Sequence, residues 1–301
     1  MQLKILINRA LEYVGYRLVR YQTVLDWEQR NQQIVNKQIS QQQDISIKKI
    51  LKDNIRIYWR TIDYQDRKGI DEDVIVCRLC GLTQASGSFR QVSARCAFGG
   101  GSLIRYQCPS CDVIFGPFKM FQLTDDELSD EYEAHYRVYE EGDSTDHELR
   151  AFYALNPVPS GRYLNFGAGK WSATTARLRN QGWDILSFEP YVSGSSGSEA
   201  SALSSWNDLN ELRFDGIFSN NVLEHLPDPV STLQNLTAIL EPSGQMVHAT
   251  PCFEYLYEDT RFHLFFFTGK SADVLAQLAK LRMVEQIRDG EYMSIRLARP
   301  A

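Results

Sequence analysis

A glycine turn between an apolar run and a helix-forming segment constrains the fold of this 301-residue chain more than any other feature. The run Tyr163–Phe166 is followed by Gly-Ala-Gly and then by helix-forming residues as far as Gly182. A second run covers Asp184–Phe188. Glycine lets the backbone turn sharply and come close to a ligand, so this pattern predicts a strand, a glycine turn, a helix and a second strand.

Glu189 directly follows the second strand, about 20 residues after the glycines, where dinucleotide-binding units place an acid that accepts hydrogen bonds from ribose hydroxyls. Further strands are expected at Phe214–Ser219 and Gln245–Thr250, and Asp289-Gly290 is expected to turn a terminal hairpin. The prediction is an α/β fold: a Rossmann-like doubly wound sheet with a C-terminal antiparallel hairpin.

Ligands bind such sheets at the carboxyl ends of the strands. The residues predicted to bind a cofactor there are Asn165, Phe166, Gly167, Ala168, Gly169, Glu189, Pro190 and Asn220.

Two CxxC pairs indicate a metal site upstream of this sheet. The pairs are Cys77 with Cys80 and Cys108 with Cys111, separated by a loop that contains three consecutive glycines. This is the ligand pattern of a zinc ribbon, in which four thiolates fill the tetrahedral shell of one Zn²⁺. We therefore expect a structural ion with no open position for chemistry. A metal-free or redox-active set is the alternative, and Cys96 is a further candidate ligand.

Composition indicates a soluble globular protein, since 43% of the residues are hydrophobic and the length suggests about two domains. The chain has no apolar run of about 18 residues and no signal-peptide pattern at its start, so a cytoplasmic location is expected. Six cysteines fit that compartment, because CxxC pairs suit metal binding in a reducing environment. The net charge of -6 argues against nucleic-acid binding.

Basic residues are concentrated at the N-terminus, where residues 1–60 contain 11 Lys and Arg against 5 Asp and Glu. Apolar residues between Leu3 and Leu18 recur at helical spacing and predict a basic amphipathic helix. Through residues 1–20 this helix would contact a partner protein or an anionic membrane at its inner face. The alternative is that it packs on its own domain or on a second subunit; oligomeric state is left open.

Residues 121–150 are strongly acidic, with 11 acids, 2 basic residues and interleaved aromatic residues that include Tyr132 and Tyr136. They predict either a solvated helical connector or a lid whose aromatic side chains cover the ligand. The expected domains are a helical extension at 1–70, a zinc-ribbon-like module at 71–120, the acidic connector or lid at 121–158 and the α/β domain at 159–301.

Three segments resemble class I S-adenosylmethionine-dependent methyltransferases. They read LNFGAG from Leu164, FEP from Phe188, and FDGIFSNNVLEHLPDP continuing to Pro251. The cysteine module with the following VIFGPFKMF also resembles the N-terminal module of sugar methyltransferases that carry a zinc ribbon. The resemblance implies S-adenosylmethionine as cofactor and a sugar acceptor, nucleotide-linked or at a glycan terminus, in surface-polysaccharide or related biosynthesis.

The family usually has an acid where this chain has Asn165. An amide can still hydrogen-bond the amino group of the cofactor's methionine part, but without charge attraction, so weaker binding is expected. A catalytically degenerate partner protein in a biosynthetic complex is therefore the alternative function. By position in the family, the candidate acid, base or acceptor-facing residues are Glu224, His225, His263 and Tyr136. Glu224 and His225 could instead bind a divalent ion, or serve only to cap the helix.

Overall fold

The computed structural model describes residues 21–69, 74–140, 142–169, 173–190 and 203–300. The chain divides into two compact units, Met1–Leu51 and Lys52–Ala301, and every site below lies within the second. The amphipathic helix expected over residues 1–20 lies outside the described residues. No helix among the described residues is long and apolar enough to cross a membrane.

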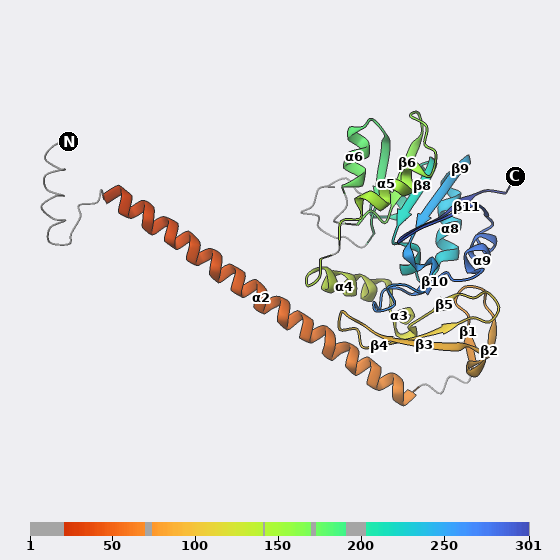
Figure 1. Ribbon diagram of the computed structural model, residues 1–301, viewed down its shortest axis with the longest axis horizontal. Helices are drawn as coiled ribbons and strands as arrows, with labels where there is room; N and C mark the ends of the chain where they lie inside the picture. Colours follow the sequence, from red (N-terminus) through yellow and green to blue (C-terminus); the bar gives the residue numbers. More distant parts are fainter. Residues whose placement is uncertain (1–20, 70–73, 141, 170–172, 191–202, 301) are drawn as a thin grey trace, which may run out of the picture. The chain divides into compact units, whose positions relative to one another are not determined.

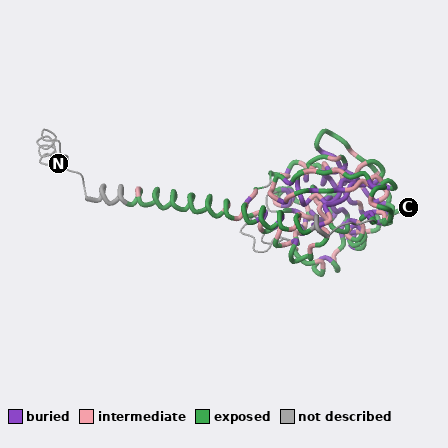
Figure 2. Tube along the Cα trace, turned by 90° about the horizontal axis from the view of Figure 1, so that it is seen from below, coloured by how far each residue is buried: buried purple, intermediate pink, exposed green. Residues whose placement is uncertain are grey.

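Helix α2, Tyr21–Gly69, covers 49 residues and runs across the boundary between the two units. Most of its described side chains are exposed, as its many Gln and Asn residues predict (Figure 2). Ile55 and Trp59 are buried, and the Trp59 indole donates to Oε2 of Glu131 at 3.1 Å. These contacts tie the last turns of α2 to the acidic helix that follows in the chain.

A mixed six-stranded sheet has the order β11-β12-β9-β8-β6-β7 (Figure 1). Its strands are β6 Arg162–Phe166, β7 Asp184–Phe188, β8 Phe214–Asn220, β9 Leu240–Ala249, β11 Arg282–Asp289 and β12 Tyr292–Ala298. The first four are parallel, and β12 and β11 add an antiparallel hairpin that turns at Gly290, with φ of 60°. The predicted α/β sheet and its terminal hairpin are confirmed.

Helices lie on both sides of this sheet, with α5 and α6 on one side and α8 and α9 on the other (Figure 1). They cover Thr145–Tyr153, Thr174–Asn180, Pro229–Ala238 and Ser271–Leu278, and short helices occur at α7 Trp206–Leu209, η2 Leu223–His225 and η3 Pro251–Phe253. Asp228 caps α8 by accepting from Ser231, directly before Pro229 at the first helical position. Phe152 of α5 packs against Tyr163 and Phe218 in the core beneath the sheet.

The cysteine module contains a two-stranded sheet, β1 Val74–Val76 with β2 Thr83–Ala85, and part of a four-stranded sheet of order β10-β5-β4-β3. The latter contains β3 Arg90–Arg95, β4 Ser102–Gln107, β5 Ile114–Phe115 and β10 Phe265–Phe266, and η1 covers Ser86–Ser88. Because β10 comes from the C-terminal half and pairs with β5, the segments expected as 71–120 and 159–301 share one sheet. The structure packs them, together with residues 121–158, into one compact unit.

Helix α3, Phe118–Phe121, leads into α4, Asp125–Tyr136, which carries the acidic residues. Thr124 and Glu127 form a capping box at the start of α4, and three acids occupy its first turn, where they interact favourably with the helix dipole. Leu128, Tyr132 and His135 are buried. One face of α4 is therefore packed, unlike a solvated connector.

Candidate functional site

A cavity of about 570 Å³ lies at the carboxyl ends of β6, β7 and β8. One part of its wall comes from the strand ends and the glycine turn: Phe166, Gly167, Ala168, Gly169, Glu189, Pro190 and Asn220. Seven of the eight predicted cofactor-binding residues therefore meet here, and Asn165 does not line the cavity. The other lining residues come mainly from α4, the residues after it and the segment around Phe262.

The glycine turn is held in a conformation that other residues adopt poorly. Gly167 and Gly169 have φ of 73° and 65°, in the left-handed region. A Cβ on Gly167 would lie 2.5 Å from Cγ2 of Val222. The Gly169 amide donates to Oε2 of Glu189 at 3.0 Å, so the turn holds the acid at the cavity wall.

Asn220 closes the end of β8, as predicted, and lines the cavity. Its side chain is 7% exposed, and its Nδ2 has no hydrogen-bond partner within the described part of the chain. A buried donor without a partner is costly, so this amide is suited to a ligand that supplies an acceptor.

Asn165 points to a carboxylate behind the turn rather than to the cavity. Its Nδ2 donates to Oε2 of Glu148 at 2.9 Å and lies 3.4 Å from Oγ1 of Thr175. Glu148, on α5, is 3% exposed, also accepts from Ser144 and lines the cavity. A carboxylate from α5 therefore lies beside position 165, where the sequence has no acid. Sequence reasoning missed it because Glu148 lay within an acidic segment that did not distinguish one carboxylate from another.

His225 lines the cavity and forms a hydrogen bond with Tyr132 of α4. Its Nδ1 lies 3.1 Å from the Tyr132 hydroxyl, and its ring packs edge-on against His263, with 4.9 Å between centroids. Burial lowers the pKa of His225 to about 4, although a hydrogen bond to the Phe262 backbone opposes this. Which of the two atoms donates in the Tyr132–His225 contact depends on the tautomer of His225. With its proton on Nε2, the neutral ring would leave Nδ1 to accept from the Tyr132 O–H.

His263 also lines the cavity, as predicted, and its Nδ1 lies 2.9 Å from the Tyr257 carbonyl. Burial and the nearby His225 hold the pKa of His263 well below its usual range. With Nδ1–H directed at a carbonyl, the Nε2 of this neutral ring is left as the acceptor. His263 and His225 are therefore both neutral at pH 7.

Glu224 does not reach the cavity, although its neighbour His225 does. It is fully buried, accepts from the Thr250 hydroxyl and has a pKa raised to about 7 by burial. Its carboxylate lies near Cys252 and His263, close enough for a shared ion. The hydrogen bond from Nδ1 of His263 to the Tyr257 carbonyl competes with metal binding by the same nitrogen. Glu224 does not line the cavity, and its predicted acid/base role, like the alternative of ion binding, stays a prediction.

Aromatic residues from α4 and the segment after it line part of the cavity. Tyr136 lines it, as predicted, and stacks on Tyr132 with 6.0 Å between centroids. Tyr139 and His135 pack against Phe98, at 4.9 and 5.0 Å. Aromatic residues of the acidic segment therefore lie in the cavity wall, and whether the segment acts as a lid or as a connector stays a prediction.

The four predicted cysteine ligands come together. The Sγ atoms of Cys77 and Cys111 and those of Cys80 and Cys108 are each 3.7 Å apart, and all four lie within 4.8 Å of one another. Zn–S bonds of about 2.3 Å in a tetrahedron require sulfur separations of about 3.8 Å, so the set fits one ion. Cys96 lies outside this group, in the loop between β3 and β4, and is not an alternative ligand.

Comparisons with known proteins support a single family. A family profile described as a methyltransferase domain matches residues 135–286, half of the chain. No curated protein matches the sequence. Among solved structures, the CcbJ methyltransferase from Streptomyces caelestis is similar at 17% identity and a TM-score of 0.41, covering 58% of this chain and 97% of that one.

A second similar structure is the 1,6-didemethyltoxoflavin-N1-methyltransferase of Burkholderia thailandensis, with bound 1,6-didemethyltoxoflavin and S-adenosylhomocysteine. It is 17% identical, has a TM-score of 0.47 and covers 66% of this chain and 96% of that one.

Proposed function

The chain belongs to the methyltransferase domain family, and from that premise we propose that it transfers a methyl group from S-adenosylmethionine to a sugar acceptor. The observation that carries the proposal is that one cavity is lined both by the glycine turn with Glu189 and by His225 and Tyr132. S-adenosylmethionine would supply an electrophilic methyl group on a sulfonium. The chain's task is to hold and align the two reactants and to remove a proton.

The residues around the glycine turn fit such a cofactor. Glu189 would accept hydrogen bonds from the ribose hydroxyls, and Gly167 leaves space where a Cβ would collide with Val222. The unpartnered Nδ2 of Asn220 offers a donor. Glu148, already held by Asn165 and Ser144, would face the methionine ammonium and replace the acid missing at position 165.

We assign proton removal to Tyr132 and His225. A hydroxyl of the acceptor placed beside the Tyr132 oxygen would pass its proton to Tyr132, whose own proton moves to Nδ1 of His225 across 3.1 Å. The depressed pKa keeps His225 in its neutral form, ready to accept. His263 would hold the acceptor through Nε2, and Tyr136 would pack against its ring face.

A sugar suits a wall that alternates aromatic faces with hydrogen-bonding tips. The supporting residues are Tyr132, Tyr136, Tyr139 and His263, all in the cavity wall. The resemblance to zinc-ribbon sugar methyltransferases favours the same class and a place in surface-polysaccharide or related biosynthesis.

We also propose that Cys77, Cys80, Cys108 and Cys111 hold a structural Zn²⁺. The sulfur separations support this, and four thiolates leave no open coordination position. The ion would join the turn after β1 to the turn before β5, and through β5 it would support β10 and the nearby His263.

Isothermal titration of the full chain with S-adenosylmethionine and S-adenosylhomocysteine tests the cofactor. We expect binding below 1 mM, weakened in Glu189→Gln and lost in Gly167→Val. Methyl label should then be followed into a panel of free, nucleotide-linked and glycan-terminal sugars. Absence of cofactor binding would overturn the proposal.

A catalytically degenerate partner protein is the second function that the sequence suggests, because of Asn165. Binding of cofactor without label transfer to any acceptor of the panel would favour it. The carboxylate of Glu148 in the cavity wall supports the active enzyme instead.

A further inference from the structure

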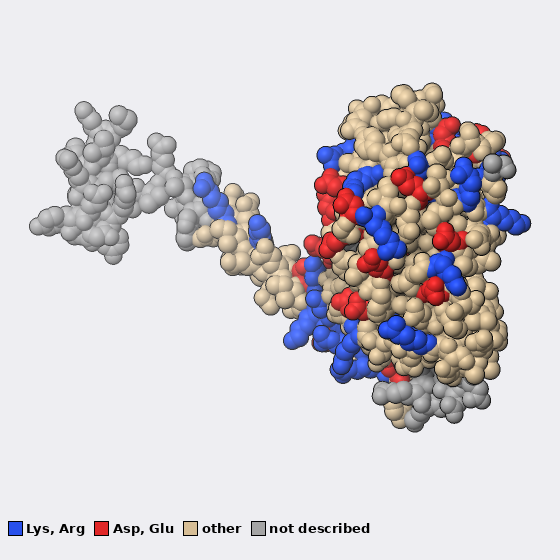
Figure 3. Space-filling view, turned by 45° about the vertical axis from the view of Figure 1, so that its right-hand side comes forward, with Lys and Arg blue, Asp and Glu red and all other residues tan. Residues whose placement is uncertain are grey.

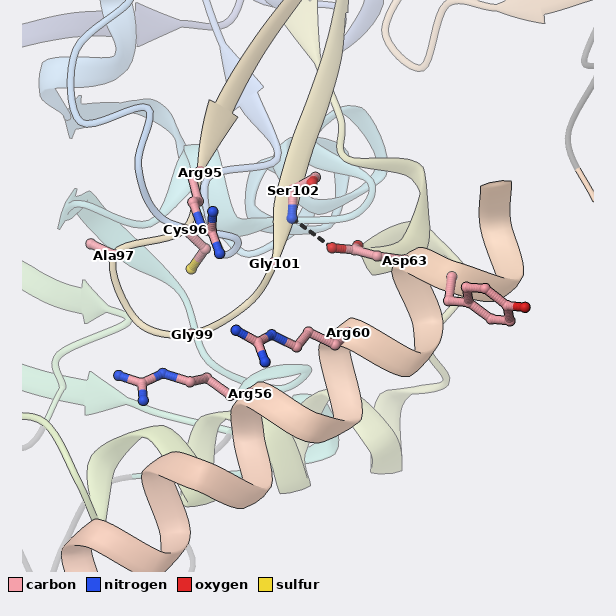
Figure 4. Close-up of a pocket in the computed structure, with 10 residues that line it drawn as sticks. Arg56, Arg60, Asp63, Arg95, Cys96, Ala97, Gly99, Gly101 and Ser102 are labelled. Carbon is pink, nitrogen blue, oxygen red and sulfur yellow. Dashed lines mark hydrogen bonds between the residues drawn. The ribbon is translucent and has the colours of Figure 1, made fainter. Parts of the chain in front are cut away.

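A second cavity, which we call the arginine cavity, has a volume of about 740 Å³ and lies between the last turns of α2 and the loop from β3 to β4. Arg56 and Arg60 extend from α2 toward this loop, and Arg95 reaches it from the end of β3 (Figure 4). Residues four apart share one face of a helix, so two guanidinium groups stand together opposite a third. Lysine and arginine side chains gather beside α2 on the face that Figure 3 shows.

One carboxylate lines this cavity, that of Asp63, and its charge is already compensated. Its Oδ1 pairs with Nζ of Lys119 at 2.7 Å, and its Oδ2 accepts from the Ser102 amide at 2.7 Å. Lys119 is 5% exposed and also donates to the Gly100 carbonyl. The three arginines therefore give the cavity an excess of positive charge.

The arginines themselves have little internal compensation. Nη1 of Arg56 lies 3.4 Å from Oδ1 of Asp53. Both side chains are more than half exposed, so this ion pair contributes little. Arg60 and Arg95 form no ion pair within the described ranges of the chain. Guanidinium groups that gather without carboxylates repel one another, and an anion between them relieves this repulsion.

The wall opposite α2 is fixed rather than adaptable. Gly101 has φ of 74°, and a Cβ there would lie 2.2 Å from Oδ2 of Asp63. The Cys96 amide donates to the Gly101 carbonyl at 2.9 Å, and the Ala97 amide to that of Asp259 at 2.8 Å. A preformed wall lowers the entropic cost of binding, since the loop is already ordered.

We propose that the arginine cavity binds the diphosphate group of a small-molecule ligand. Arginine binds phosphate oxygens in pairs through its planar fork. The charge of three guanidinium groups exceeds the roughly -2 charge of one phosphate group and is better matched by a diphosphate. The volume of about 740 Å³ also leaves space for a group attached to the diphosphate. A nucleic acid fits less well, because the charge is confined to a concave site on a chain of net charge -6. The inference does not depend on methyl transfer.

The cavity adjoins the proposed methyl-transfer cavity through one loop. Ala97 and Gly99 line the arginine cavity, and Phe98 between them lines the other and packs on Tyr139. A ligand on one side of this loop therefore contacts residues adjacent to the wall of the other.

Isothermal titration of the full chain with pyrophosphate at low ionic strength tests the proposal. We expect one saturable site that weakens with added salt, and about tenfold weaker binding in each of Arg56→Gln, Arg60→Gln and Arg95→Gln. Arg95→Lys should bind with intermediate affinity, since it keeps the charge and loses the fork. Uridine diphosphate should bind at least as tightly as pyrophosphate, and inorganic phosphate more weakly.

Arg90→Gln is the matched control, because Arg90 is exposed on the same strand, bonds to Gln107 and does not line the cavity. It should bind pyrophosphate like the unaltered chain. Circular dichroism verifies the folding of every variant, and S-adenosylmethionine titration of the same samples reports the other cavity independently. Pyrophosphate affinity in the three arginine variants equal to that of the unaltered chain, or an equal loss of affinity in Arg90→Gln, would overturn the proposal.

Discussion

The side-chain amide of Asn165 donates to the carboxylate of Glu148, with 2.9 Å between Nδ2 and Oε2. Both side chains are buried, but Glu148 lines the cavity at the strand ends and Asn165 does not. The carboxylate of Glu148 on α5 thus lies beside position 165, where the sequence itself has no acid. A neutral amide at position 165 donates a hydrogen bond to this carboxylate, whereas a second carboxylate there would repel it.

Replacing Glu148 with Gln should weaken S-adenosylmethionine binding about 10- to 100-fold, because a charge-assisted bond to the ammonium is lost. Titration calorimetry measures this effect. Methylthioadenosine, which lacks the amino-acid part, should bind both proteins equally. Glu133→Gln, at an exposed ion pair on α4, is the control. Unchanged cofactor affinity in Glu148→Gln would refute the assignment.

Asn165→Asp should destabilise the protein instead of improving the site. It places two buried carboxylates in contact, which costs about 3 kcal/mol at pH 7 unless they share a proton. Urea unfolding should show the loss at pH 7 and a smaller one at pH 5, where sharing a proton is easier. Tighter cofactor binding with full stability would contradict the role of Glu148.

The purified chain should contain one zinc ion per molecule, measured by elemental analysis. Cys108→Ser should lower the zinc content and the unfolding temperature together, because the ion's binding energy contributes to folding. Cys96→Ser should retain the zinc, since Cys96 lies outside the four-thiol group. Loss of zinc in Cys96→Ser alone would require a different ligand set.

Tyr132→Phe should lower kcat by about 10- to 100-fold with little change in cofactor affinity, since it interrupts proton transfer to His225. The pKa of His225 is about 4, below the usual value, so the residue stays neutral and competent through pH 5. A pH profile of kcat/KM should therefore lack an acid limb near pH 6.5 and fall only near pH 4. An acid limb at 6.5 would show that another histidine carries the proton.

His248 should make the protein less stable as pH falls. It is fully buried, bonds to Ser219 at 2.8 Å, and burial lowers its pKa to about 3. The unfolded chain then binds a proton that the folded chain does not, between about pH 6.5 and pH 3. Stability should decline by up to about 1.4 kcal/mol per pH unit from this residue.

His248→Gln should flatten that dependence in urea unfolding between pH 7 and 5. Equal slopes in the unaltered protein and His248→Gln would exclude the explanation.

The sequence by itself determined the elements whose signals are local. A strand ending in Gly-Ala-Gly, an acid after the next strand, two CxxC pairs and an Asp-Gly hairpin each follow from residue spacing, because periodicity and turn chemistry act over a few residues. These signals predicted the α/β sheet, and they brought seven candidate residues to one cavity.

Only the tertiary structure decided which partners lie across that cavity. Tyr132 and Glu148 come from helices before the sheet. In the same way, Arg56 and Arg60 of α2 meet Arg95 of β3 only in the separate arginine cavity. Glu224 and His225 are adjacent in sequence, yet one is buried behind the wall and the other lines it. Contacts between distant segments depend on the packing of whole elements, and spacing along a single chain does not encode which side chains that packing brings together.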